Sequence, residues 1–256
     1  MVFGQSRTIA MVEPGPSPIS EREFHRYSLD RASILTTRIP FDRMTNVGLR
    51  EMIDKLPFAV GCIVGARPGV IAINSFTGSC LKGREIVNTV QQLTGAPAIV
   101  PADEMVKHLI RLRVSRIALV SPFSAEFNML ERIYFDSRNI EVAGVISIHS
   151  GLERFRPDDP YIITGITPES ILRQIREAKN IGGVGAVVLD SPTFVLGDLI
   201  DELELFIKVP IMSTNQILLY SAFNCLGIPT ENLVVSRYLD QGPELGASAY
   251  MSREVR

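Results

Sequence analysis

The chain of 256 residues is long enough for one large domain or two small ones, each with a buried core. Its composition, 46% hydrophobic and 21% charged, is that of an ordinary soluble globular protein. The formal net charge of -2 gives no basic surface for nucleic acid, and no charge block or long apolar run suggests membrane contact.

The cysteines and the N-terminal sequence bear on the compartment. Cys62, Cys80 and Cys225 are an odd number without metal-ligand spacing, which favours reduced thiols. The first 18 residues lack the long apolar core of a signal peptide. We therefore expect a cytoplasmic protein without a bound metal.

Apolar runs typical of buried strands recur along the chain. They cover residues 8–12, 32–37, 69–74, 97–100, 116–120, 142–148, 186–190 and 209–213. Helical patterns lie between them, at 45–56, 80–94, 102–113, 124–138, 168–180, 197–207 and 214–226. This alternation predicts an α/β fold with parallel sheets and right-handed crossovers. The first four runs and the last four have comparable spacing, as if one unit occurs twice.

The residues that follow the strands indicate where a ligand binds, because ligands of parallel sheets lie beyond the carboxyl ends of the strands. These residues are Glu13-Pro14, Arg38, Asn74-Ser75, Pro101, Ser121-Pro122, His149-Ser150, Asp190-Ser191 and Ser213-Thr214. The set is rich in hydroxyl groups and poor in metal ligands. It favours a site for a small anion.

Five segments resemble one family in their order and spacing. They are MVEPGPSPISEREF (11–24), VIAINSFTGS (70–79), LVSPF (119–123), LDSPT (189–193) and IMSTNQILLYSAF (211–223). Together they resemble the aspartate/glutamate racemase superfamily over roughly residues 7–228, and within it the maleate isomerase and arylmalonate decarboxylase group. The resemblance implies two pseudo-symmetric, flavodoxin-like halves, with the site in the cleft between them. It implies domains of 1–114 plus 212–256 and of 115–211.

The resemblance also implies a cofactor-independent enzyme that acts on a small mono- or dicarboxylic acid. Its members use two facing cysteines, and here Ser75 and Ser191 stand in their places. A serine hydroxyl donates hydrogen bonds, but it is a poor general base unless another group takes its proton. Racemisation by two thiols is therefore not expected. Stabilisation of an enediolate or oxyanion, in an isomerase, racemase or decarboxylase type of reaction, remains open.

The first loop is expected to hold the carboxylate. Thr77, Gly78 and Ser79 would present backbone N–H groups at the start of the helix 80–94, and Gly78 would let the ligand approach closely. Simple helix capping is the alternative for these three residues. We expect Ser75 to orient the ligand, since no neighbour in sequence can act as its base.

Other positions follow from the resemblance and have plainer interpretations. Pro14 ends the first strand, Ser17 stands where maleate isomerases carry asparagine, and Phe123 stands where the family has tyrosine. Pro192 and Thr193 follow Ser191 in the second loop. Loop, cap, core or first-turn roles would explain Ser17, Thr193, Phe123 and Pro192 equally.

Two further hypotheses remain open. Asp190 and His149 are departures from the family pattern, and His149 beside a carboxylate could take the proton of Ser191 in a serine-dependent hydrolase or lyase. A strand-end histidine and a helix-capping Asp190 are the structural alternatives. The third hypothesis is a carboxylate-binding protein without catalysis. The sequence leaves the substrate and the oligomeric state open, a homo-oligomer included.

Overall fold

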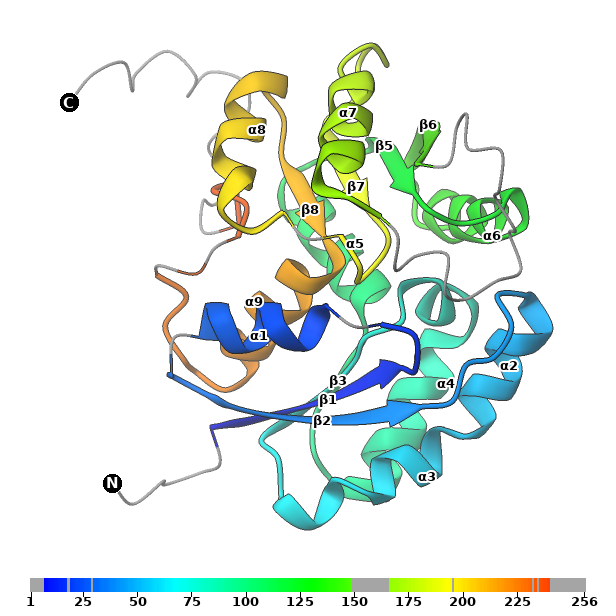
Figure 1. The fold of residues 1–256 in the computed structure, drawn as a ribbon, viewed down its shortest axis with the longest axis vertical. Coiled ribbons are helices and arrows are strands. Elements are labelled where there is room, and N and C mark those ends of the chain that lie inside the picture. The colour runs from blue at the N-terminus through cyan, green and yellow to red at the C-terminus, as the bar shows by residue number, and fades with distance from the viewer. Residues whose placement is uncertain are drawn as a thin grey trace.

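The protein forms two parallel four-stranded sheets, seen here in a computed structural model that describes residues 7–17, 19–28, 30–148, 166–194, 196–231, 233 and 235–239. The first sheet has the order β2-β1-β3-β4 and contains β1 (Thr8–Pro14), β2 (Ser33–Ile39), β3 (Val70–Ile73) and β4 (Ala98–Ile99). The second has the order β6-β5-β7-β8 and contains β5 (Arg116–Ser121), β6 (Glu141–Ser147), β7 (Ala186–Leu189) and β8 (Ile211–Ser213). Both sheets thus have one topology, and the predicted α/β class with two similar halves is confirmed (Figure 1).

Helices connect the strands. They are α1 (Ser20–Ser28), α2 (Asn46–Asp54), α3 (Leu56–Gly61), α4 (Phe76–Thr94), α5 (Pro101–Arg111), α6 (Ala125–Asp136), α7 (Pro168–Ala178), α8 (Ile200–Ile207) and α9 (Thr214–Cys225), with short 3-10 turns η1 (Val64–Ala66) and η3 (Gly197–Leu199). Each of the predicted helical stretches overlaps one of these helices, but α4 and α5 begin before the predicted stretches 80–94 and 102–113, and α1 and α3 are not predicted as separate helices. In the described part of the chain, no helix is long and apolar enough to cross a membrane.

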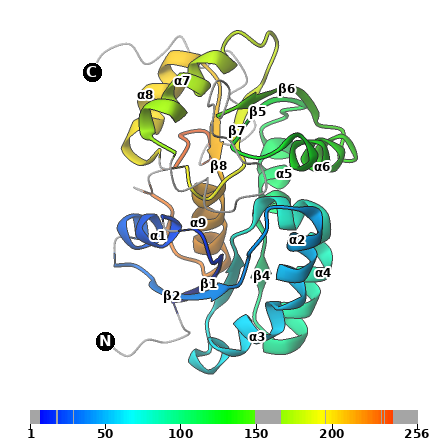
Figure 2. The same cartoon turned by 45° about the vertical axis from the view of Figure 1, so that its right-hand side comes forward.

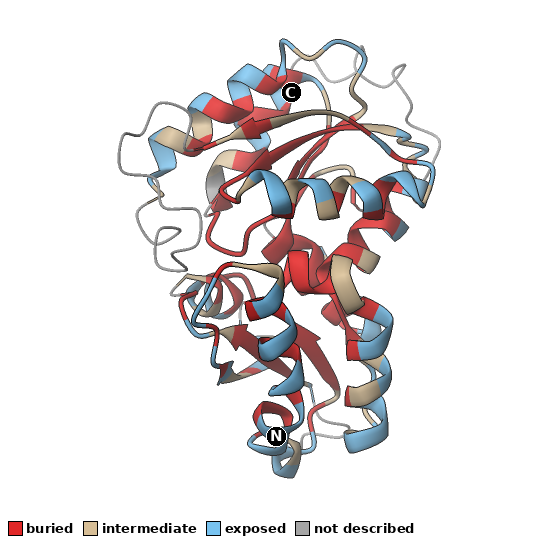
Figure 3. Ribbon diagram, turned by 90° about the vertical axis from the view of Figure 1, so that its right-hand side faces the viewer, coloured by how far each residue is buried: buried red, intermediate tan, exposed pale blue. Residues whose placement is uncertain are grey.

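Side chains alternate between the two faces of each strand, so each sheet is covered on both sides. In β1, Ile9 and Met11 pack toward α1, α5 and α9, whereas Ala10 and Val12 pack toward α2, α3 and α4. Buried residues accordingly run through both sheets and the inner faces of the helices, and the outer helix faces are exposed (Figure 3).

Helix α9 lies between the two sheets (Figures 1 and 2). It follows β8 of the second sheet and packs against α1, α5, β3 and β4 of the first half. Its residues from Thr214 to Phe223 are all buried, as expected for a helix surrounded by protein on every side. One apolar cluster includes α9 together with strands of both sheets, so the two halves share a core.

Candidate active site at the junction of the two halves

The two loops expected to carry the site occupy equivalent places. Ser75 lies two residues after Ile73, the last residue of β3, and Ser191 lies two residues after Leu189, the last residue of β7. β3 and β7 have the same position in their sheets, next to the first strand of each half. The shared topology therefore places both serines beyond the carboxyl end of an equivalent strand.

Helix α4 begins at Phe76, which corrects the predicted start at residue 80. Ser75 is its N-cap, with φ -131° and ψ 101°, and the Ser75 side chain makes no capping hydrogen bond. The first N–H group bonded within the helix is that of Ser79, which donates to the carbonyl of Ser75 at 2.9 Å. The prediction that the Ser79 N–H is free for a ligand is therefore wrong. The N–H groups of the three preceding residues remain at the open end of the helix.

Gly78 allows the Ser75 side chain to lie against this first turn. A Cβ atom at position 78 would come within 2.5 Å of Ser75 Oγ and 3.2 Å of Ser75 Cβ. Any larger residue would push the serine away, so the glycine determines where the Ser75 hydroxyl can sit.

The side chains of Thr77 and Ser79 have different surroundings. The Thr77 hydroxyl is 2.6 Å from Glu131 Oε1 of α6, a bond that joins the two halves. The Ser79 hydroxyl donates to the carbonyl of Phe76 and accepts from the N–H of Ala102, at the start of α5. Ser79 thus holds two helix ends together and is not brought to the ligand side.

A small cavity, the interface pocket, lies where the two halves meet. Its apolar wall from the first half comprises Pro14, Pro16, Phe41, Met44, Leu49 and Phe76. Its polar residues are Ser17, Asn74, Ser75 and Thr77, and the second half adds Phe123, Phe127 and Pro192. The pocket thus gathers six of the predicted site residues, contains no charged side chain, and has a volume of about 30 Å³, room for one or two water molecules.

The second loop reaches this pocket through Pro192, whereas Ser191 and Thr193 do not line it. Ser191 is fully buried, and its hydroxyl is 2.7 Å from that of Thr193. Thr193 lines a separate cavity between α1 and α7. His149 lies outside the described residues, so its pairing with Ser191 stays a prediction.

Behind the interface pocket lies a buried polar network that sequence analysis missed. Asn74 Nδ2 donates to Glu13 Oε1 at 2.7 Å and to Asn215 Oδ1 at 2.9 Å. Asn215 Nδ2 donates to Glu23 Oε2 at 2.6 Å and to the carbonyl of Pro192 at 2.8 Å. The network therefore ties the second loop to the first half. The position of Glu13 at the end of the first predicted strand is the sequence signal for this network.

Burial favours the neutral form of the network carboxyl groups. Desolvation raises the pKa of Glu13 to about 8, although hydrogen bonds from Asn74 and Ser20 act in the opposite direction. Desolvation likewise raises the pKa of Glu23 to about 7. These carboxyl groups help to set the geometry of Asn74, which itself lines the pocket.

Asp190 interacts with Glu131, a second residue that sequence analysis missed. Both side chains are fully buried. Burial raises the pKa of Asp190 to about 7 and that of Glu131 well above its usual range, and the charge of Asp190 raises the Glu131 pKa further. Glu131 shares a helix face with Phe127, Tyr134 and Phe135. The sequence signal for Glu131 is a charged residue at helical spacing within an otherwise apolar helix face.

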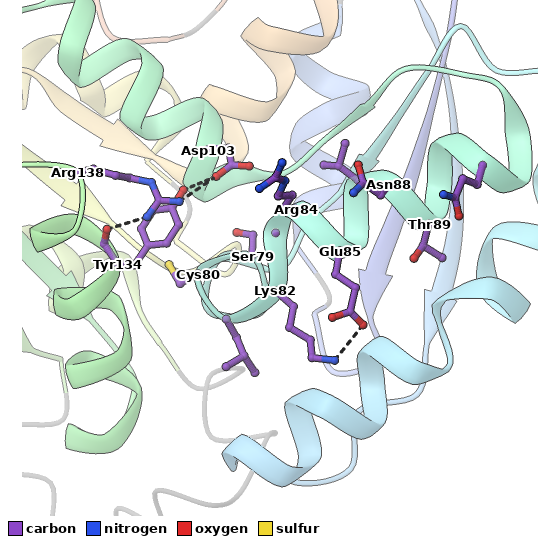
Figure 4. Close-up of a pocket in the computed structure, with 14 residues that line it drawn as sticks. Ser79, Cys80, Lys82, Arg84, Glu85, Asn88, Thr89, Asp103, Tyr134 and Arg138 are labelled. Atoms are coloured by element: carbon purple, nitrogen blue, oxygen red, sulfur yellow. Dashed lines mark hydrogen bonds and ion pairs between the residues drawn. The ribbon is translucent and has the colours of Figure 1, made fainter.

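A different feature is a surface groove beside the start of α4 (Figure 4). It is an open groove of about 970 Å³ over α4, α5 and α6, and Cys80 lies in it. Its charged side chains are largely paired with each other, as in Lys82 with Glu85 and Arg138 with Asp103. Burial raises the pKa of the Cys80 thiol well above its usual value, so the thiol stays protonated and is a poor nucleophile.

The described residues contain no cluster of three or more His, Cys, Asp or Glu side chains that could hold a metal ion. No family model and no curated protein sequence matches the chain.

Solved structures do match, over nearly the whole chain. A liganded double mutant of arylmalonate decarboxylase superposes with a TM-score of 0.79 at 16% identity, covering 92% of this chain and 99% of that chain. Nocardia farcinica maleate cis-trans isomerase bound to TRIS gives 0.79 at 20% identity, covering 92% and 98%. Maleate isomerase Iso from Pseudomonas putida S16 gives 0.78 at 15% identity, covering 91% and 98%. At these identities the likeness establishes the fold.

Proposed function

We propose that the chain is a divergent member of the aspartate/glutamate racemase superfamily, close to its maleate isomerase and arylmalonate decarboxylase group. It binds a small carboxylic acid in the interface pocket and acts on it without a cofactor, as an isomerase, racemase or decarboxylase. The fold supports the group, because proteins of both kinds superpose on this chain over about nine-tenths of its length.

The observation that carries the proposal is the start of α4 at the interface pocket. Phe76 and Thr77 line the pocket, and Ser75 lines it without using its hydroxyl as a cap. The N–H groups of a first helical turn and the helix dipole favour an anion at that place. No lysine or arginine lines the pocket, so these N–H groups are its main source of positive potential.

The chemistry that fits this arrangement is stabilisation of negative charge on oxygen. Loss of a proton or of carbon dioxide next to a carboxylate leaves an enediolate, whose oxygens need hydrogen-bond donors aimed at them. The Ser75 hydroxyl and the helix N–H groups are such donors. In this proposal Ser75 orients and stabilises the ligand, and it does not act as the base.

The test is a binding and turnover panel with maleate, malonate, phenylmalonate and aspartate. Specific binding raises the melting temperature by mass action, and the neutral diamide of malonate serves as the control. We expect stabilisation by at least one acid, none by the diamide, and turnover of the bound acid by nuclear magnetic resonance. If no acid raises the melting temperature up to millimolar concentration, the proposed function is wrong.

A second candidate is a carboxylate-binding protein without catalysis. The observation that favours it is the Ser191 hydroxyl, which is fully buried and bonded to Thr193. Binding without turnover of any acid on the panel would select this candidate.

A further inference from the structure

Glu131 and Asp190, here called the acid pair, form an unusual buried group. Asp190 follows β7 and Glu131 projects from α6, and neither side chain is exposed to solvent. No hydrogen bond of ordinary geometry reaches either oxygen of Asp190 or Glu131 Oε2, although the Ser121 hydroxyl and the Asp190 backbone N–H lie near enough to lower the Asp190 pKa in part. The two carboxyl groups lie close enough to hydrogen-bond each other. Two ionised carboxylates this close together would repel each other strongly, because burial removes the solvent that would screen their charges. The arrangement therefore requires a proton between the two groups.

The charges around the acid pair do not remove this requirement. Cys80 of α4 lies next to the acid pair. The charged groups that shift the pKa of Cys80 are the pair itself, Asp103 of α5 and Arg138 after α6. Arg138 already faces Asp103 at 3.8 Å, and its guanidinium lies over the ring of Tyr134. The pKa values of Cys80 and Tyr134 are raised, so both are neutral and offer no positive charge.

Thr77 connects the acid pair to the interface pocket. Its hydroxyl oxygen is 2.6 Å from Glu131 Oε1, and the same residue lines the pocket at the first turn of α4. When Glu131 donates its proton to this oxygen, the Thr77 hydroxyl is free to donate into the pocket. When the pair has lost its proton, Thr77 must donate to Glu131 and presents only lone pairs to a ligand.

We propose that Glu131 and Asp190 share one proton, and that the Thr77 hydroxyl passes it to an oxyanion bound at the start of α4. The inference rests on the proposed function, and it supplies the acid that Ser75 and Ser191 cannot provide. Thr77 is the residue that touches the ligand, and the acid pair is its proton store.

The step balances without another reactant. The O–H bond of Thr77 breaks as an O–H bond forms on the ligand, while the O–H bond of Glu131 breaks and that of Thr77 is restored. The acid pair is left with one negative charge more, and the ligand with one fewer. Solvent returns a proton to the pair after the product leaves.

The experiment measures how maleate and phenylmalonate binding depends on pH between 7 and 9. Calorimetric titrations in HEPES and in Tris report protons taken up on binding, because the two buffers release protons with different heats. We expect wild-type affinity to fall by up to about tenfold per pH unit as the pair loses its proton, with uptake approaching one proton per ligand.

Three variants test whether the acid pair and Thr77 transfer the proton. Glu131→Gln can donate an N–H group to Thr77 as the protonated acid does, but it cannot share or release a proton, so its affinity should not depend on pH and no proton should be taken up on binding. Thr77→Val leaves the pair intact but breaks the connection, and should also lose the uptake. Glu204→Gln removes another buried glutamate, which accepts from Ser236, the Ile211 N–H and Arg237 far from the acid pair, and should behave as wild type.

The outcomes separate this inference from the proposed function. Acid binding with equal affinity at all pH values and no proton uptake in the wild type would overturn the inference alone. Wild-type uptake that persists in Thr77→Val would also overturn it. If neither probe binds at any pH, the proposed function fails and the inference fails with it.

Discussion

Gly78 and Ser75 are in direct contact across the first turn of α4, so close that a methyl group on Gly78 would overlap the Ser75 hydroxyl. Gly78→Ala should therefore displace Ser75 and weaken acid binding, while it leaves the helix formed, because alanine favours helix more than glycine does. Affinity and melting temperature measured together test this. Gly83→Ala in the same helix is the control, since its Cβ would meet only ordinary contacts at 3.5 Å or more. Equal affinity in both variants would contradict the prediction.

Ser75 should contribute to binding more than to turnover. Ser75→Ala removes one hydrogen-bond donor and should weaken acid binding by about 1–3 kcal/mol if a buried partner is left unsatisfied, with some turnover retained. Steady-state kinetics and calorimetry separate the two effects. Complete loss of turnover at unchanged affinity would show that Ser75 takes part in the chemistry.

Thiols at the two loop positions should reveal how far the site follows the family pattern. In Ser75→Cys/Ser191→Cys, the thiol at position 75 lies at the N-terminus of α4, which lowers a thiol pKa. We expect thiolate absorbance in the ultraviolet to develop at a lower pH than that of Cys225, whose pKa burial raises. The variant should also catalyse solvent deuterium exchange into the bound acid. A thiol that titrates like Cys225 would refute this description of the loop.

Glu13 should make the protein less stable as the pH rises. Its pKa is raised from 4.5 to about 8 by burial, so the stability of the neutral form is fully present below about pH 4.5 and is lost as the pH approaches 8. The loss attributable to this residue is at most about 5 kcal/mol. Glu13→Gln should flatten the curve of unfolding free energy between pH 5 and 8. The exposed Glu21, paired with Arg38, provides the control variant Glu21→Gln, which should retain the wild-type slope.

Asn215 should be intolerant of a charge. Asn215→Asp places a carboxylate 2.6 Å from Glu23, where Asn215 Nδ2 now donates, and removes the bond to the Pro192 carbonyl. We expect a loss of about 3 kcal/mol at pH 8, smaller at pH 5, where one of the two carboxyl groups is protonated. Denaturant unfolding at both pH values measures it. Asn88→Asp on the exposed side of α4 should cost little at either pH.

The predicted fold agrees with the structure because the sequences of the buried parallel strands are continuous apolar runs, such as VIAI in β3 and AVVL in β7. The start of α4 was missed for a tertiary reason. Residues 76–79 lack an amphipathic pattern because they are buried between the halves on every side. Short α3 has little periodicity to detect.

Two signals in the sequence led to residues of the interface pocket. Pro14 and Ser75 stand at the ends of predicted strands, and the resemblance added Ser17, Phe123 and Pro192. Glu131 and Asn215 lie on helices, and they reach the junction through contacts with residues more than fifty positions away in the chain. Spacing within one segment cannot reveal such pairs.

The core that the two halves share through α9 determines how the protein unfolds. Strands of both sheets pack into one apolar cluster with α9, so parting the halves would expose that cluster to water. We expect one cooperative unfolding transition in denaturant, with coincident midpoints for probes placed in either sheet. A ligand larger than the cavity should therefore enter when the side chains of Met44, just before α2, and Leu49, within α2, move aside. The two sheets should keep their mutual orientation.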